Sequence, residues 1–175
     1  LIIDFPPGTS DEPLTVAQNL PDIDGMVIVT TPQDVALLDS RKSITFANSL
    51  KVDVIGVIEN MSCYTVSGKA PSGAEIELAA PGGKTIRVTA DEEGHWSGTL
   101  DIFKSGGGEK TAEEFGVPFL GKLPFDPGFV RGGDDGVHRI VSEPDGASSQ
   151  AFASVVSEIQ SRVESGSTDS GLEII

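Results

Sequence analysis

The chain has 175 residues, of which 38% are hydrophobic, and its formal net charge is −15. This composition is typical of one globular domain with a hydrophobic core and room for a small insert. The acidic balance argues against a nucleic-acid partner, which needs clustered Lys and Arg, and no apolar run approaches the roughly 20 residues that cross a bilayer.

The first third of the chain predicts strands that alternate with a helix. Three apolar runs predict buried strands, at residues 1–5, 25–31 and 52–60. Between the last two, residues 34–50 predict a helix, because Leu37, Ile44 and Ala47 would lie near one face of it. Runs that are apolar on both faces are typical of parallel strands covered by helices on each side.

Residues 64–100 interrupt this alternation. "AEIEL" and "TIRVT" alternate apolar and polar residues with period two, and "APSG", "APGG" and "DEEG" are turn sequences. This segment therefore predicts a small antiparallel β insert of two to four strands.

The remainder returns to the first pattern. It predicts a helix at about 107–115, a strand within 117–126 and a helix at about 148–164. The predicted fold class is α/β, a mostly parallel sheet with flanking helices and a small antiparallel insert. The predicted organisation is an α/β domain of residues 1–63 and 101–164, an insert of residues 64–100 and a flexible tail of residues 165–175.

The stretch "LIIDFPPGTSDEPLT" places an acid directly after an apolar run. An Asp at such a strand end can hold the Mg²⁺ of a nucleoside triphosphate, and Gly8 could offer its backbone N–H to a γ-phosphate. The alternative is that Asp4 caps a turn through a local hydrogen bond. Because the chain starts at Leu1 within this apolar run, we also expect it to be a fragment or a processed product.

Two other strand ends carry candidate ligand contacts. Asn60 follows the run at 52–60 and could bind a base edge through its amide, although Asn is equally common as a turn residue. "SGGGEK" at 105–110 resembles a phosphate loop ahead of a helix, but its spacing differs from GxxxxGK[ST]. Lys110 would then either pair with an acid or point to solvent.

Cys63 is the one cysteine, which excludes an intrachain disulfide and favours a reducing compartment, so we expect the cytoplasm. Its thiol could be a metal ligand or a small buried apolar group. His95 and His138 have no carboxylates at a spacing that indicates a metal site.

Five segments together resemble one known family. They are "LIIDFPPGTSDEPLT", "DGMVIVTTPQDVALLDSRKSI", "VIGVIENMS", "DIFKSGGGEKTAEEFGVPFLGKLPFDP" and "RGGDDG", in this order. They resemble the Mrp/ApbC-type iron–sulfur cluster carrier ATPases, which are relatives of MinD and of the nitrogenase iron protein among the deviant P-loop NTPases. The resemblance covers residues 1–62 and 101–164.

The resemblance implies roles for the first segment and for the cofactors. Asp4 matches the Walker B acid, which holds Mg²⁺ through water. Pro6, Pro7 and Gly8 match the switch II turn that senses the γ-phosphate. The implied activity is ATP hydrolysis coupled to the transfer of an iron–sulfur cluster to apo-proteins by a homodimer, without a nucleic-acid or membrane partner.

The resemblance also implies a contact with the nucleotide base. Asn60 matches the Asn that contacts adenine, and the turn around Pro124 and Asp126 matches the segment that packs on the base. Cys63 lies near the position where the family's cluster ligands are expected.

Two features depart from the family pattern. The deviant Walker A loop, GKGGVGK[ST], is absent from the 175 residues, so we expect this chain alone to be inactive as an ATPase. The C-x-x-C that follows "ENMS" in the family is also absent, and its place is taken by the insert. With Cys63 as the one thiol, we expect weak or no cluster binding.

The insert and the departures leave other functions open. Residues 66–100 resemble part of a bacterial immunoglobulin-like repeat, or are an unrelated hairpin with common turn sequences. One alternative is a binding module in which the insert recognises a partner and a degenerate ATPase core is the scaffold. Another is a MinD/ParA-like positioning ATPase, which would need a basic face or an amphipathic tail.

Overall fold

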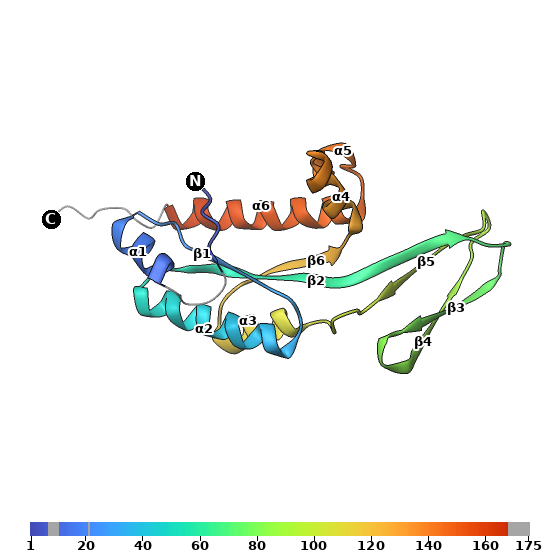
Figure 1. The fold of residues 1–175 in the computed structure, drawn as a ribbon, viewed down its shortest axis with the longest axis horizontal. Coiled ribbons are helices and arrows are strands. Elements are labelled where there is room, and N and C mark those ends of the chain that lie inside the picture. Colours follow the sequence, from blue (N-terminus) through green and yellow to red (C-terminus); the bar gives the residue numbers. More distant parts are fainter. Residues whose placement is uncertain (7–10, 21, 168–175) are drawn as a thin grey trace.

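The structure is a computed structural model that describes residues 1–6, 11–20 and 22–167. Its centre is a sheet of three parallel strands, β1 (Met26–Thr30), β2 (Val54–Lys69) and β6 (Phe119–Phe125). β2 lies in the middle and pairs with β1 along one edge and with β6 along the other (Figure 1). The predicted α/β fold with a mostly parallel sheet is confirmed.

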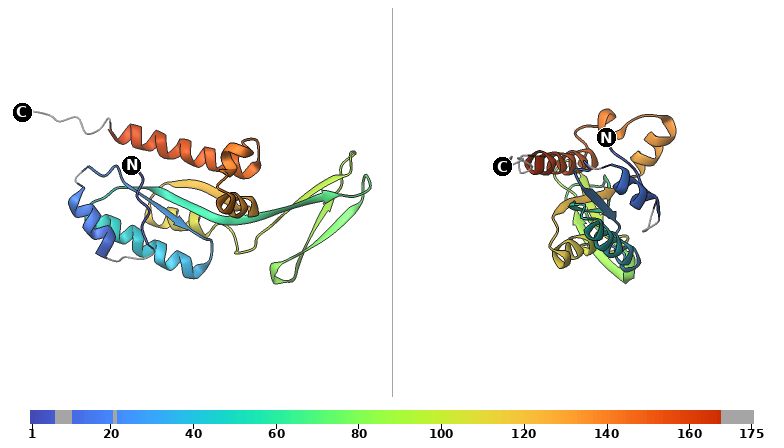
Figure 2. Two further views of the ribbon diagram at one scale, coloured as in Figure 1. Left: turned by 45° about the horizontal axis from the view of Figure 1, so that its top comes forward. Right: turned by 90° about the vertical axis from the view of Figure 1, so that its left-hand side faces the viewer.

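Helices cover both faces of this sheet (Figures 1 and 2). α2 (Asp34–Leu50) and α3 (Gly107–Phe115) pack on one face, where the core residues are Ile28, Ile44, Val57 and Ala112. α6 (Ala147–Ser167) packs on the other face, where the core residues are Ile58, Leu120 and Val155. The predicted bounds of α2 and α3 are confirmed, because their apolar spacing matches the faces that they bury.

Three further helices were not predicted. They are α1 (Asp11–Asn19), α4 (Pro127–Asp135) and α5 (Arg139–Ser142). α4 has the sequence "PGFVRGGDD", whose three glycines disfavour a helix, and α5 is only four residues long. Among the described residues, no helix is both long and apolar enough to span a membrane.

The prediction of a buried strand at residues 1–5 is wrong. These residues form no strand, and the side chains of Leu1, Ile2, Ile3 and Asp4 are exposed. A buried parallel strand needs a neighbouring strand that supplies hydrogen bonds, and no described strand pairs with this segment. The apolar pattern alone therefore overpredicted regular structure there.

The insert at residues 64–100, which we call the arm, projects from the α/β body (Figure 2). β2 continues into it without a break, and β5 (His95–Leu100) pairs with residues 64–69 of β2 in antiparallel orientation. β3 (Glu75–Ala80) and β4 (Lys84–Thr89) form a separate two-stranded sheet, joined by a short 3₁₀ turn at Pro81–Gly83. The antiparallel character predicted for the insert is confirmed.

Details of the predicted organisation differ from the structure. The expected boundary between residues 63 and 64 lies inside β2, so the arm is a prolongation of the central strand. The resemblance of residues 66–100 to an immunoglobulin-like repeat is not confirmed. Of the expected tail, residues 165–167 belong to α6, and residues 168–175 lie outside the described part.

Candidate functional site

The carboxyl ends of the three parallel strands lie at one edge of the sheet, which is where ligands bind in open α/β folds. β2 and β6 are in register there, with Asn60 opposite Leu123. Pro124 follows next in β6, and Asp126 comes directly after that strand. The structure therefore places Asn60 opposite Leu123, the residue directly before Pro124, whereas Phe125 lies opposite Tyr64 and Asp126 follows it.

A bulge in β2 marks this edge. Past Asn60, β2 advances four residues to Tyr64 while β6 advances two. Met61 has φ 54°, in the left-handed region that residues other than glycine seldom occupy. The hydroxyl of Ser62 donates a hydrogen bond to the carbonyl oxygen of Leu123 at 3.2 Å, which ties the bulge to β6. Bulges of this kind are frequent next to active sites, because they re-aim side chains.

The side chain of Asn60 takes part in the bulge. Its Oδ1 accepts a hydrogen bond from the backbone N–H of Met61 at 2.9 Å. This contact is the turn role that the sequence left open for Asn60. Its Nδ2 has no hydrogen-bond partner within the described chain, so Asn60 keeps a donor for a ligand at the sheet edge.

Asp126 joins three helices to the end of β6. Its Oδ1 accepts a hydrogen bond from the backbone N–H of Gly128 at 2.7 Å, which caps α4. Its Oδ2 accepts from Nε of Arg139 in α5 at 3.2 Å, and Ser148 in α6 also hydrogen-bonds to the carboxylate. Sequence reasoning missed Arg139, because nothing local to its position indicates a partner in another element.

These contacts decide the charge of Asp126. Burial alone would raise the pKa of its carboxyl, but the hydrogen bonds from Gly128, Ser148 and Arg139 hold that pKa below its ordinary value. The carboxylate is therefore ionised at neutral pH and engaged inside the protein. Pro124 and Phe125 are the last two residues of β6 and Asp126 caps α4, so the predicted turn is the junction of this strand and this helix. What this junction can offer a base is its backbone and the ring of Pro124.

Glu59 is a second residue that sequence reasoning missed. It precedes Asn60 in β2, and its side chain is fully buried. Its Oε1 accepts a hydrogen bond from the N–H of Gly106 at 3.0 Å, and its Oε2 accepts one from the N–H of Gly108 at 2.7 Å. A carboxylate at the start of α3 is also favoured by the helix dipole. The available signal was an acid inside an otherwise apolar strand, because such a charge must find buried donors.

The hydrogen bonds to Glu59 involve the loop "SGGGEK", which the sequence compared with a phosphate loop. A phosphate loop needs free backbone N–H groups, whereas the N–H groups of Gly106 and Gly108 already donate to Glu59. Lys110 is exposed and lies at the lip of a groove between α2 and this loop. The loop therefore has a structural role in the chain, with Glu59 as its internal anion.

The other predicted site residues lie apart from this arrangement or outside the described part. Asp4 and Pro6 are exposed in the segment of residues 1–6 that precedes α1. Pro7 and Gly8 lie outside the described residues.

Cys63 lies in the bulge and is half-buried. It is the single cysteine of the chain, and among the described residues no group of three or more His, Cys, Asp or Glu side chains could hold a metal ion. An iron–sulfur cluster takes four protein ligands. The residues of one copy of this chain therefore do not fit a cluster, and no step through a cluster is assigned to them.

The three-layer fold, in which helices cover both faces of a parallel sheet, places the chain in the class of α/β nucleotide-binding folds. The solved structure of the cell-division ATPase MinD of Pyrococcus furiosus has the same fold, with a TM-score of 0.51 at 17% identity, over 79% of this chain and 43% of that one.

Sequence comparison gives the family. The family model described as "ParA: NUBPL iron-transfer P-loop NTPase" matches residues 1–80 and 89–160, and the chain belongs to this family. An iron–sulfur cluster carrier protein of Methanocaldococcus jannaschii is 38% identical over 94% of this chain and 47% of its own length. A carrier protein of the same name from Synechocystis is 39% identical over 93% of this chain and 38% of its own length. The chain thus spans about half, or less, of the curated relatives that it matches.

Proposed function

We propose that this chain forms the base-binding part of the ATP site in an iron–sulfur cluster carrier ATPase. The observation that carries the proposal is that Asn60 lies opposite Leu123, the residue before the segment Pro124–Asp126, at the carboxyl edge of the sheet. The free Nδ2 of Asn60 offers a hydrogen-bond donor to a base, and the adjacent segment offers the apolar ring of Pro124 and backbone groups. The names of the curated relatives support the carrier role.

The remaining parts of the proposal concern the phosphates. Asp4 would hold Mg²⁺ through water, and Pro6, Pro7 and Gly8 would form the turn that senses the γ-phosphate. The 175 residues contain no GKGGVGK[ST] loop, and the glycine loop before α3 is filled by Glu59. We therefore expect this chain alone to bind and hydrolyse ATP poorly, and we assign hydrolysis to a homodimer of full family length that delivers clusters to apo-proteins.

The proposal is tested by Asp4→Ala in a protein of full family length that contains this chain. We expect ATP turnover to fall at least about tenfold, because the metal that neutralises phosphate charge loses its acid. Steady-state phosphate release at saturating Mg²⁺ measures the effect. Asp24→Ala, at an exposed acid before β1, is the matched control and should leave turnover unchanged. Equal turnover in Asp4→Ala and the parent would contradict the assignment.

A second candidate function is partner recognition by the arm. It is favoured by the projection of the arm away from the α/β body, which leaves its strands accessible (Figure 1). Lys69 and His95 lie opposite each other in the ladder of β2 and β5. A two-residue Asn-Gly turn can therefore join them in place of residues 70–94, which shortens the arm. We expect this shortened protein, at full family length, to keep ATP turnover and to lose transfer of a cluster to an apo-protein. Unchanged cluster transfer by the shortened protein would show that the arm does not recognise the partner.

A further inference from the structure

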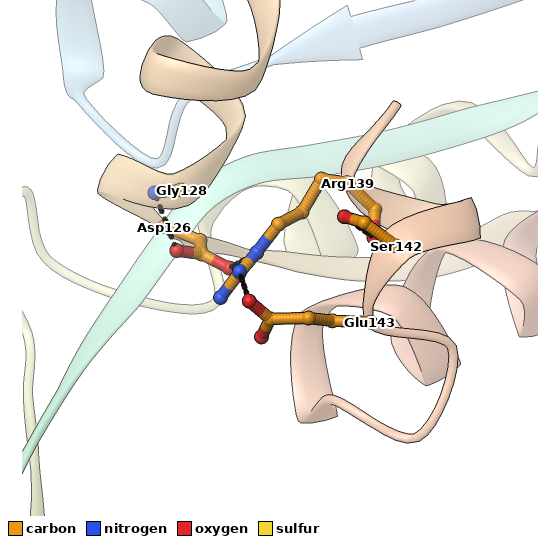
Figure 3. A network of polar contacts seen from close by, with 5 residues as sticks. All are labelled: Asp126, Gly128, Arg139, Ser142 and Glu143. Atoms are coloured by element: carbon orange, nitrogen blue, oxygen red, sulfur yellow. Dashed lines mark hydrogen bonds and ion pairs between the residues drawn. The ribbon is translucent and has the colours of Figure 1, made fainter. Parts of the chain in front are cut away.

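Arg139 connects α5 to the end of β6 through Asp126, and it also pairs with Glu143 at the C-terminal end of α5 (Figure 3). Its Nε donates to Oδ2 of Asp126 at 3.2 Å, and its Nη1 donates to Glu143. The side chains of Arg139 and Asp126 are 25% and 16% exposed, whereas that of Glu143 is 54% exposed. The inner pair is thus shielded from solvent and the outer pair is not, so the Asp126 contact is the stronger of the two.

The guanidinium also packs against the first turn of α4. A Cβ atom at Gly128 would lie 2.4 Å from Nε of Arg139, so the arginine occupies the space that any side chain at this position would need. The same Gly128 donates its N–H to Asp126. Arg139 therefore fixes the carboxylate and the helix start together.

The turn is held on its other side by β2. Phe125 contacts Tyr64 edge to face, with ring centroids 5.7 Å apart, and Leu123 pairs with Asn60. The residues from Leu123 to Asp126 therefore run between two anchors, β2 on one side and Arg139 on the other. A change at Arg139 releases one anchor and leaves the other in place.

We propose that Arg139 is a positioning residue for the nucleotide base, which acts by holding the segment Pro124–Asp126 that follows Leu123, the residue opposite Asn60. The proposal rests on the proposed function, because it requires that this edge binds an adenine nucleotide. It assigns Arg139 to the base and not to the phosphates, because Pro124 directly follows Leu123, the residue opposite Asn60, while the residues proposed for the phosphates belong to the segment around Asp4. Arg139 does not touch the ligand itself.

The reason that Arg139 matters separately from helix stability is the way in which Asp126 is bonded. In Arg139→Met, Asp126 keeps the N–H of Gly128, so the cap of α4 remains. It loses the N–H that Arg139 donates to Oδ2, so the carboxylate keeps fewer donors and takes up water in place of the guanidinium. Water entering beside Asp126 loosens the turn on the side that faces α5. The base then binds a turn that must first be ordered, which weakens binding.

The experiment compares Mg-ATP with Mg-tripolyphosphate, which has the same phosphates and no base, on a protein of full family length. For Arg139→Met we expect the Kd for ATP to rise about tenfold, while the Kd for tripolyphosphate changes less than about twofold. Arg139→Lys, which can donate to Asp126 without the planar fork, should recover part of the ATP affinity. Calorimetric titration gives both constants, and circular dichroism melting checks that each variant is folded.

The possible outcomes distinguish the role of Arg139 from the proposed binding of a base at this edge. If the parent binds ATP no better than tripolyphosphate, this edge binds no base, and the proposed function fails together with the inference. If the parent prefers ATP and Arg139→Met preserves that preference, the role of Arg139 is overturned while the function stands. An equal loss of affinity for ATP and for tripolyphosphate also overturns the role of Arg139, because general destabilisation of the protein would weaken both. Glu143→Gln, which leaves the pair of Arg139 and Asp126 intact, is the matched control and should change neither Kd.

Discussion

Glu59→Ala is expected to lower the free energy of unfolding by about 3 kcal/mol, because it leaves one buried and one partly buried backbone N–H group without an acceptor. In the native chain both oxygens of Glu59 are used, one by Gly106 and one by Gly108, and the side chain is fully buried. Each orphaned donor costs about 1–3 kcal/mol, and the start of α3 also loses an anion that favours its dipole. Urea unfolding of this chain, followed by circular dichroism, measures the difference.

Two comparisons make the result specific. Glu59→Gln retains one acceptor oxygen but turns an amide NH₂ toward the other donor. We therefore expect its free energy of unfolding to lie between those of the parent and of Glu59→Ala. Glu77→Ala, in the exposed pair with Arg87 on the arm, should cost less than about 1 kcal/mol. A loss for Glu59→Ala no larger than that for Glu77→Ala would show that the loop does not depend on this carboxylate.

Sequence predicts those elements whose signals are local. The helix at 34–50 is predicted because Leu37, Ile44 and Ala47 share one face, and all three are buried in the structure. The helix at 107–115 is predicted after a run of glycines, and Gly106 and Gly116 adopt the left-handed conformation at its two ends. In both cases the information lies within the element or next to it.

The rest depends on contacts between distant residues. The apolar run at residues 1–5 looks like β1 in sequence, but β1 pairs with β2 and the run pairs with no described strand. The continuation of β2 into the arm is hidden by the bulge after Asn60, because "MSC" does not read as a strand. The buried partners of Glu59 and Arg139 are likewise invisible in the sequence, since each lies on another element.

The candidate site shows the same division. Asn60 was chosen from its place at a strand end as well as through the family resemblance, and Pro124 and Asp126 were chosen through the resemblance alone. The structure places Asn60 opposite Leu123, the residue before Pro124. What the resemblance could not supply is how their polar atoms are used. The Oδ1 of Asn60 and the carboxylate of Asp126 bond inside the protein, which leaves an amide donor and a backbone turn for a ligand.

The position of that edge depends on Gly56, where β2 lies close against β6. A Cβ atom there would lie 2.6 Å from Cγ of Leu120 and 2.7 Å from the carbonyl oxygen of Pro118. The Leu120 side chain is buried in the core under α6, and the Pro118 oxygen accepts the N–H of Val57 at 2.9 Å. Neither atom can retreat without losing packing or a ladder hydrogen bond.

Gly56→Ala is therefore expected to lower the free energy of unfolding by about 3 kcal/mol, near the upper end for overpacking a core. Urea unfolding of this chain measures it. Gly133→Ala is the matched control, because that glycine is exposed in α4 and a Cβ atom added there would meet no described atom within 4 Å. The control should gain up to about 1 kcal/mol from helix propensity. The two substitutions thus have opposite expected signs, and a Gly56→Ala protein as stable as the parent would mean that β2 and β6 can separate without cost.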